Sequence, residues 1–134
     1  MSTVPNHALR QLRAGKLAVG LGLRQARTVD TAQIAKTAGF DWLFIDCEHN
    51  SMDTDMAAQI AAASLAVGIT PVVRVAGKEH WLSSRMLDNG AQGIVVPHVE
   101  TALEAKRIAD HCRFPPIGHR SMGGGLQQLG FAPM

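Results

Sequence analysis

Three side chains able to do acid–base chemistry follow one short apolar segment of the sequence. Asp46, Glu48 and His49 come directly after the run WLFI at residues 42–45. Imidazole is the usual general base near neutral pH, and a pair of nearby carboxylates can orient such a base or lie beside a metal ion. A loop histidine hydrogen-bonded to a neighbour, preceded by solvated carboxylates at the end of a strand, gives the same pattern, so both interpretations stay open at this point.

An arginine interrupts a second apolar segment. Arg74 stands within the run VVRV at residues 72–75. A guanidinium placed in a buried strand is costly unless it meets an anion. That anion is either Asp46 or Glu48, in a structural salt bridge, or the carboxylate of a substrate held by the planar guanidinium.

Further candidates are more scattered. His98 and Glu100 could supply two ligands on one side of a strand, but no third ligand lies nearby in the sequence. Asp88 ends an expected helix, which puts it at the opposite end of the strands from the other candidates; it would reach their site only across a contact between subunits. Arg120 and Ser121 lie in a glycine-rich loop whose backbone amides can approach an anion, although a flexible linker has the same composition.

A repeated pattern of elements would position these residues. Short apolar runs typical of buried strands alternate with segments of helical periodicity, most of which end at a glycine. Asp53 or Thr54 can cap the second helix, and Thr101 with Glu104 forms a capping box for the last. The expected strands are residues 17–23, 42–47, 70–75 and 93–99, and the expected helices are residues 28–38, 55–67, 80–89 and 102–112.

Four such strand–helix units predict an α/β protein with a parallel sheet, because strands that are apolar throughout must be covered on both faces. A doubly wound sheet would favour a glycine-rich phosphate turn after the first strand, and Gly20 and Gly22 have no third glycine at the fingerprint spacing. A TIM barrel better explains why polar residues gather after the strands, at the end where barrel enzymes keep their chemistry. We therefore expect a (βα)4 half of a TIM (β/α)8 barrel, with parallel strands and outer helices.

Length limits this interpretation. A complete barrel takes roughly 200 to 250 residues, and this chain has 134. We expect residues 1–134 to form one domain, the N-terminal half of a pyruvate-type barrel, with residues 113–134 as a Gly/Pro-rich loop leading to a missing second half. Otherwise the first and fourth strands would be unpaired sheet edges, and the chain would have to pair with a second copy of itself.

Composition excludes several classes of protein. The chain carries 13 Lys and Arg against 11 Asp and Glu, and the basic residues are scattered, so we expect no nucleic-acid partner. No apolar run is long enough for a membrane span, and residues 1–7 do not resemble a secretion signal. Cys47 and Cys112 match no metal or redox spacing, which suggests a cytoplasmic protein with free thiols. From these residues alone, phosphate chemistry, carboxylate binding and no activity all remain possible.

Four stretches carry a resemblance to a known family. These are FDWLFIDCEHN at residues 40–50, PVVRV at 71–75, MLDNGAQGIVVPHVE at 86–100 and RFPPIGHRSMGG at 113–124. In this order they resemble the HpcH/HpaI aldolase family, which includes aldolases of aromatic-compound catabolism and of 2-keto-3-deoxy sugar acids. The resemblance implies a TIM barrel in trimers or hexamers that catalyses reversible class II aldol cleavage of a 2-keto-4-hydroxy acid. The products are pyruvate, or a close analogue, and an aldehyde.

The resemblance also implies roles for individual residues. His49 matches the family's base, which acts through a water molecule, and Asp88 matches the aspartate that partners it. Arg74 matches the arginine that binds the pyruvate oxygens, while Asp46 and Glu48 match acids near the water shell of a divalent metal, commonly Mg²⁺, Mn²⁺ or Co²⁺.

The metal ligands of the family, a glutamate and an aspartate, follow later strands, so we expect them beyond Met134 and none within this chain. A non-catalytic half-barrel that folds by homodimerisation is the main alternative. Cleavage of a CoA thioester, as in citrate lyases, fits the Glu48–His49 pair less well.

Overall fold

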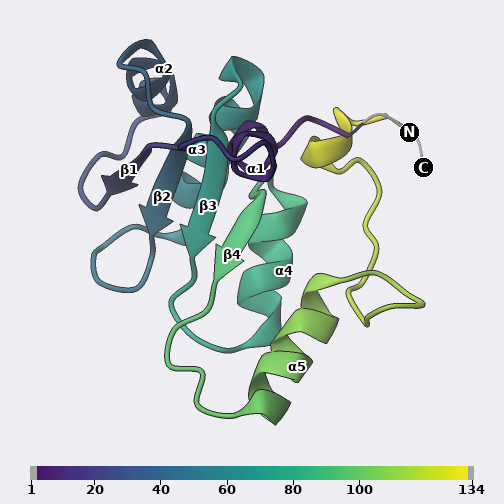
Figure 1. Cartoon of the computed structure of the whole chain (residues 1–134). Coiled ribbons are helices and arrows are strands. Elements are labelled where there is room, and N and C mark those ends of the chain that lie inside the picture. Colours follow the sequence, from purple (N-terminus) through teal and green to yellow (C-terminus); the bar gives the residue numbers. More distant parts are fainter. Residues whose placement is uncertain (1–2, 133–134) are drawn as a thin grey trace.

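The computed structural model describes residues 3–132, which form one parallel four-stranded sheet in the order β1-β2-β3-β4 (Figure 1). The strands are β1 (Gly20–Leu23), β2 (Trp42–Asp46), β3 (Thr70–Arg74) and β4 (Gly93–Val95). The helices are α1 (His7–Arg13), α2 (Asp30–Thr37), α3 (Thr54–Val67), α4 (His80–Asp88), α5 (Ala102–Cys112) and the 3-10 helix η1 (Gln127–Leu129). The predicted α/β class, the parallel strands and the four strand–helix units are confirmed.

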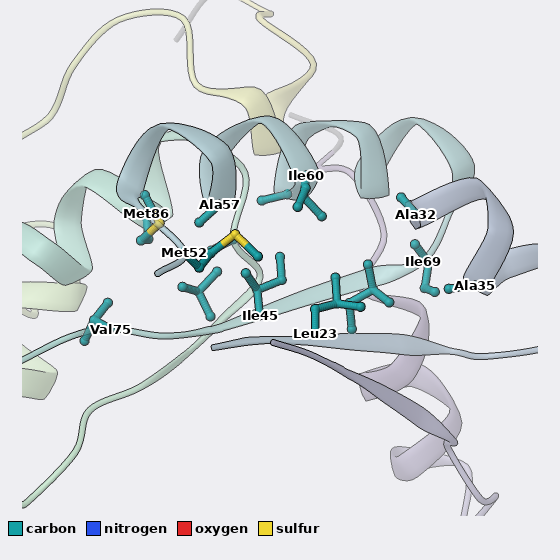
Figure 2. Close-up of a cluster of buried hydrophobic side chains, with 14 residues drawn as sticks. Leu23, Ala32, Ala35, Ile45, Met52, Ala57, Ile60, Ile69, Val75 and Met86 are labelled. Carbon is teal, nitrogen blue, oxygen red and sulfur yellow. The ribbon is translucent and has the colours of Figure 1, made fainter. Parts of the chain in front are cut away.

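The hydrophobic core lies between one face of the sheet and the helices that follow the strands. Side chains alternate along a strand, so Leu43 and Ile45 share a face and are fully buried. Figure 2 shows Ile60 and Ala57 of α3 pointing toward Ile45 and Leu23. Burial of large apolar side chains contributes about 1.5–3 kcal/mol each, so this layer fixes which face of each strand is turned away from the helices.

The opposite face of the sheet carries the alternate residues. Trp42 and Phe44 of β2 and Val72 of β3 lie on it and are partly exposed. At the carboxyl end of the same face, Asp46 lies in register with Arg74, and Arg74 with Val95. This face would be the interior of a closed barrel.

A helix that the sequence did not predict covers the amino end of this inner face. The Asn6 side chain caps α1 by accepting a hydrogen bond from the Leu9 N–H, 2.9 Å away. The Ala8 N–H donates to Thr70 Oγ1 at 3.1 Å, and Gln11 Nε2 donates to Asp41 Oδ1 at 2.9 Å. Contacts with the starts of β2 and β3 therefore hold α1 in place.

Several predicted boundaries were too long. The first strand begins at Gly20 rather than at residue 17, because both backbone groups of Val19 bond to Asp41. The Val19 carbonyl accepts from the Asp41 N–H, and the Val19 N–H donates to the Asp41 carboxylate. The fourth strand ends at Val95 rather than at residue 99, since Pro97 has no N–H to donate and His98 adopts a left-handed backbone, with φ 55°. The strands expected at residues 42–47 and 70–75 each end one residue early. The helices expected at residues 28–38 and 80–89 are also shorter, and correspond to α2 and α4.

Helix caps were predicted more closely. Asp53 caps α3 through the Met56 N–H at 2.9 Å, and Gly68 ends that helix at a φ of 71°. Thr101 Oγ1 accepts from the Glu104 N–H, while the Glu104 carboxylate accepts from the N–H of Glu100, one residue before the cap. No helix within residues 3–132 combines the length and apolarity needed to cross a membrane.

The segment expected as a loop over residues 113–134 contains η1 and returns to the amino end of the sheet. The Val4 N–H donates to the Gln128 carbonyl at 2.7 Å, and Leu126 is buried. Residues 133–134 lie outside the described part of the chain.

Candidate functional site

An ion pair joins the carboxyl ends of the two central strands. Arg74 Nε and Nη2 donate to Asp46 Oδ1 and Oδ2 at 2.9 and 2.7 Å, which is the two-pronged geometry that suits a guanidinium and a carboxylate. Asp46 Oδ1 also accepts from the N–H groups of Glu48 and His49. The Arg74 hydrogen bond lowers the pKa of Asp46 to about 2, with the two backbone N–H groups helping against the effect of burial.

Glu48 extends this pair into a cluster. One Glu48 oxygen lies 3.0 Å from Arg74 Nη1 and 3.6 Å from His49 Nε2, and the other lies 2.8 Å from His98 Nε2. The Asp46 and Glu48 side chains are 4% and 10% exposed, whereas those of His49 and His98 are 58% and 74% exposed. Carboxylates therefore form the inner part of the cluster and imidazoles its solvent-facing part.

Arg74 keeps donors for a ligand. A guanidinium has five N–H bonds, and the contacts to Asp46 and Glu48 occupy three of them. The Arg74 side chain is 23% exposed, and its Cζ lies 5.5 Å from the centroid of the Phe44 ring. The two interpretations of Arg74 from sequence are thus compatible: it forms structural salt bridges and still has two N–H bonds for an anion.

The loop after β1 supports the cluster from the side. Arg24 Nη2 donates to the His49 carbonyl at 3.2 Å, and Arg27 contacts both the carbonyl and the hydroxyl of Ser51. Neither arginine was a site candidate from sequence. Their position just beyond the carboxyl end of β1, next to the loop that follows β2, is the signal that could have found them.

His98 and Glu100 do not form the paired ligands considered from sequence. The strand ends before them, and His98 turns toward Glu48 while the Glu100 N–H donates to Glu104. His98 therefore belongs to the cluster through a contact that no spacing rule anticipates.

Asp88, Arg120 and Ser121 are not part of this cluster. Asp88 ends α4 before β4 begins, at the opposite end of the strands, as its sequence position predicts. Its Oδ1 lies 2.5 Å from Arg120 Nη2. Arg120 and Ser121 lie in the loop after α5, where they line a pocket on the helical side of the molecule. In this structure, therefore, Arg120 and Ser121 do not face the Asp46–Arg74 pair.

Neither cysteine has the environment of a nucleophile. Burial, with the charges of Asp46 and Asp53, raises the pKa of the Cys47 thiol to about 11, and burial also raises the pKa of Cys112. Both thiols are free. Thiols with raised pKa are protonated and inert near neutral pH.

Within residues 3–132, no three His, Cys, Asp or Glu side chains gather closely enough to hold a metal ion. His49 and His98 each contact Glu48, but Arg74 already neutralises the carboxylates beside them. The residues present therefore do not fit the ligand set of a divalent metal. What they do offer is a partly exposed guanidinium beside open imidazoles, an arrangement suited to binding a small anion and moving a proton next to it.

The fold and this cluster define the class as an α/β half-barrel with a polar site at the carboxyl ends of its strands. The model of the HpcH/HpaI aldolase/citrate lyase family matches residues 24–129, and the chain belongs to this family. The resemblance read from the sequence is thereby confirmed.

Individual relatives agree with this assignment. The chain is 42% identical over 131 residues to a 4-hydroxy-4-methyl-2-oxoglutarate aldolase of Hapsidospora irregularis, covering 97% of this chain and 48% of that protein. It is 44% identical over 93 residues to a hydroxypyruvate/pyruvate aldolase of Roseobacter denitrificans, covering 69% and 36%. The crystal structure of an HpcH/HpaI aldolase from Desulfitobacterium hafniense superposes with a TM-score of 0.86 at 28% identity, covering 94% of this chain and 48% of that one.

The chain spans about half the length of curated relatives that match it over nearly its whole length. The solved structures that it resembles are TIM-barrel proteins that include HpcH/HpaI family proteins and a macrophomate synthase, and the chain covers 48%, 51% and 41% of these. The four strands thus correspond to one half of a TIM barrel, as the sequence predicted.

Proposed function

We propose that this chain supplies the base and the anion-binding arginine of a class II pyruvate aldolase. The reaction is reversible cleavage of a 2-keto-4-hydroxy acid to pyruvate, or a close analogue, and an aldehyde. The observation that supports it most is that Arg74 and His49 both contact Glu48 at the carboxyl end of the sheet, while two Arg74 N–H bonds are not used by Asp46 or Glu48.

In the cleavage direction, His49 accepts the proton of the C4 hydroxyl through a water molecule. The C3–C4 bond breaks, its electron pair stays on the keto-acid fragment as an enolate, and the aldehyde leaves. Protonation of the enolate at C3 then gives pyruvate. Arg74 binds the keto-acid oxygens on which negative charge develops, while Asp46 fixes the plane of the guanidinium, so its donors need no reorganisation during the reaction.

A divalent metal, Mg²⁺, Mn²⁺ or Co²⁺, is part of this proposal by family membership. It would act as a Lewis acid at the keto oxygen. Because residues 3–132 hold no ligand set for it, its ligands would have to come from a polypeptide segment other than the one described.

Asp88 enters the proposal only through assembly into a trimer or hexamer. Its side chain is 37% exposed and lies at the far end of the strands from His49. It could partner a histidine of a neighbouring copy, but not the His49 of its own chain. Release of Asp88 from Arg120 would accompany that contact.

Deuterium exchange at the methyl group of pyruvate tests this proposal, because enolisation requires no knowledge of the aldehyde. Exchange is followed by NMR with the 134-residue chain, with Mn²⁺ or Mg²⁺ and then with EDTA. The matched controls for His49→Ala and Arg74→Ala are His7→Ala and Arg13→Ala, which remove the same side chains from exposed positions of α1.

We expect no exchange from the chain alone, and metal-dependent exchange once the second half of a relative's barrel is added as a separate polypeptide. His49→Ala and Arg74→Ala should then abolish exchange, while the two controls retain it. Exchange that survives loss of Arg74 would refute the proposed role of the cluster.

A second candidate function is a non-catalytic half-barrel that dimerises. The observation in its favour is that β1 and β4 each have one strand neighbour within the described residues. A folded dimer that does not enolise pyruvate even after the second half is supplied would favour it.

A further inference from the structure

A surface pocket of about 260 Å³ lies on the helical side of the molecule, away from the inner face of the sheet. It is formed by α4, α5 and the loop that follows α5. Its lining includes five side chains that carry or can take positive charge: His80, Arg85, His111, His119 and Arg120. No aspartate or glutamate lines it.

Three imidazole rings from three segments meet along this pocket. The rings of His80, at the start of α4, and His111, in the last turn of α5, stack with centroids 4.7 Å apart and an interplanar angle of 29°. The His119 ring lies 6.4 Å from that of His111. Cationic groups held this close repel one another unless an anion lies among them, so the arrangement favours a bound anion when the imidazoles are protonated.

Arg120 provides a second, independent observation. Its side chain is 93% buried, a position in which the donors of a guanidinium need hydrogen-bond partners. Nη2 pairs with Asp88, and Cζ lies 4.5 Å from the centroid of the Phe114 ring. Among the described residues, however, the buried Nε finds no hydrogen-bond partner. A buried guanidinium N–H without an acceptor is unfavourable, and a ligand oxygen that reaches it would satisfy it.

The backbone holds the loop rigidly at this position. The His119 N–H donates to the Asp110 carbonyl at 2.7 Å, and the Arg120 N–H donates to the Arg113 carbonyl at 2.9 Å. Gly118 packs so closely against the Asp110 carbonyl that a Cβ would overlap it. His119 and Arg120 are therefore presented by a hydrogen-bonded turn, while the other cationic side chains of the pocket come from α4 and α5.

Two nearby carboxylates are already paired, one of them with a lining residue of the pocket. Asp88 is taken by Arg120, and Asp110 pairs with Lys106 at 2.7 Å. Arg85 is exposed, and no ion pair to it occurs among the described residues. The Asp88–Arg120 pair is thus neutral overall, and Arg85 is the lining arginine whose charge no carboxylate of the described residues offsets.

We propose that this pocket binds the phosphate group of a small molecule. Donors reach it from three segments, which suits a tetrahedral, doubly charged group better than a planar, singly charged carboxylate. The site is distinct from the Asp46–Arg74 cluster of its own chain, and its test requires no aldolase activity.

Titration with inorganic phosphate, followed by long-range proton–nitrogen NMR of the histidine rings in the 134-residue chain, tests the proposal. We expect saturable shifts of His80, His111 and His119 below about 10 mM phosphate, with His7 unaffected. Acetate serves as the carboxylate arm of the experiment and should bind at least tenfold more weakly.

The double variant Arg85→Gln/His119→Gln removes two exposed cationic groups and leaves the buried Asp88–Arg120 pair intact. It should weaken phosphate binding about tenfold, whereas Arg13→Gln, on α1, should change it less than about twofold. Absence of saturable shifts, equal weakening in Arg13→Gln, or acetate binding as tight as phosphate would each overturn the proposal.

Discussion

At the scale of single residues, Arg74 controls the charge balance of the cluster. It neutralises two carboxylates that are nearly buried, Asp46 and Glu48. Removing one member of such a pair leaves an uncompensated charge with little access to water, which costs more than the pair itself contributes. The stability of this end of the sheet should therefore respond differently to loss of one partner and loss of both.

Arg74→Met should lower the free energy of unfolding by about 3 kcal/mol, the lower end of the range for a broken buried pair, because Arg74 is partly exposed. The double variant Asp46→Asn/Arg74→Met should recover part of that loss, since no buried charge at position 46 then lacks a partner. Urea denaturation of the two variants at pH 7 measures the difference. A double variant that is less stable than Arg74→Met would contradict the burial argument.

Asp46 should also make stability depend on pH. Its pKa in the folded chain is about 2, below the ordinary value of 3.8, so its contribution is fully present above about pH 4 and is lost as the pH falls toward 2. The shift corresponds to about 2 kcal/mol. Asp46→Asn should be less stable than the parent at pH 6, and the difference should shrink by about this amount near pH 2.

Urea denaturation at pH 6, 4 and 2.5 follows this difference. Asp55→Asn is the matched control, because Asp55 is an exposed carboxylate on α3. If the difference in unfolding free energy between Asp46→Asn and the parent stays constant with pH, the arginine contact does not lower the pKa of Asp46.

At the scale of elements, β1 has no side chains at two positions of its inner face, because both residues are glycines. A Cβ on Gly20 would overlap the Trp42 indole of the neighbouring strand, whereas a Cβ on Gly22 would meet nothing within 4 Å. Both glycines point to the same side of the sheet. The indole of Trp42 thus lies across Gly20 and donates from Nε1 to the Ala18 carbonyl at 3.4 Å.

Gly20→Ala should therefore displace Trp42 and destabilise the chain by about 1–3 kcal/mol, the usual cost of overpacking. Gly22→Ala, on the same strand and face, should change the free energy of unfolding by less than about 0.5 kcal/mol. Fluorescence in a Trp81→Phe background isolates Trp42 and should change in Gly20→Ala alone. Equal effects of the two substitutions would show that the close approach at Gly20 is not maintained in solution.

Sequence predicted the elements whose signals are local and missed those fixed by distant contacts. The carboxyl ends of parallel strands meet at one edge, so Asp46 and Arg74 could be placed together from their positions alone. The sequence of α1 does not predict a helix, because it has no buried apolar face: Leu9 and Leu12 are 40% and 59% exposed. Hydrogen bonds to Asp41 and Thr70 hold the helix in place.

The contacts of His98 and Arg120 depend on tertiary structure in the same way. His98 reaches Glu48, 50 residues earlier, through a left-handed backbone conformation that its sequence context does not specify. Arg120 and Asp88 are 32 residues apart and meet only because the loop after α5 folds back onto α4. Family resemblance gave Asp88 a role, but only the structure shows what it contacts in the single chain.

At the scale of the whole molecule, the edge formed by β4 is incomplete. An apolar groove of about 480 Å³ lies between β4 and α5, lined in part by Ile94, Val96, Val99 and Ile108. Helix α5 packs against α4 and has no buried residue of its own. Apolar grooves beside an unpaired strand are sites at which another chain adds.

We expect the 134-residue chain to self-associate through this groove when no second half is supplied. Val99→Glu should weaken that association, because Val99 is 40% exposed in the free chain and a charge there would be buried in the complex. Ile117→Glu is the matched control, since Ile117 is 72% exposed and outside the groove. Sedimentation velocity over a range of concentrations should show the parent and Ile117→Glu dissociating together, and Val99→Glu dissociating at higher concentration. A parent chain that sediments as a monomer at every concentration would mean that the groove between β4 and α5 stays exposed to solvent and does not bind a second copy.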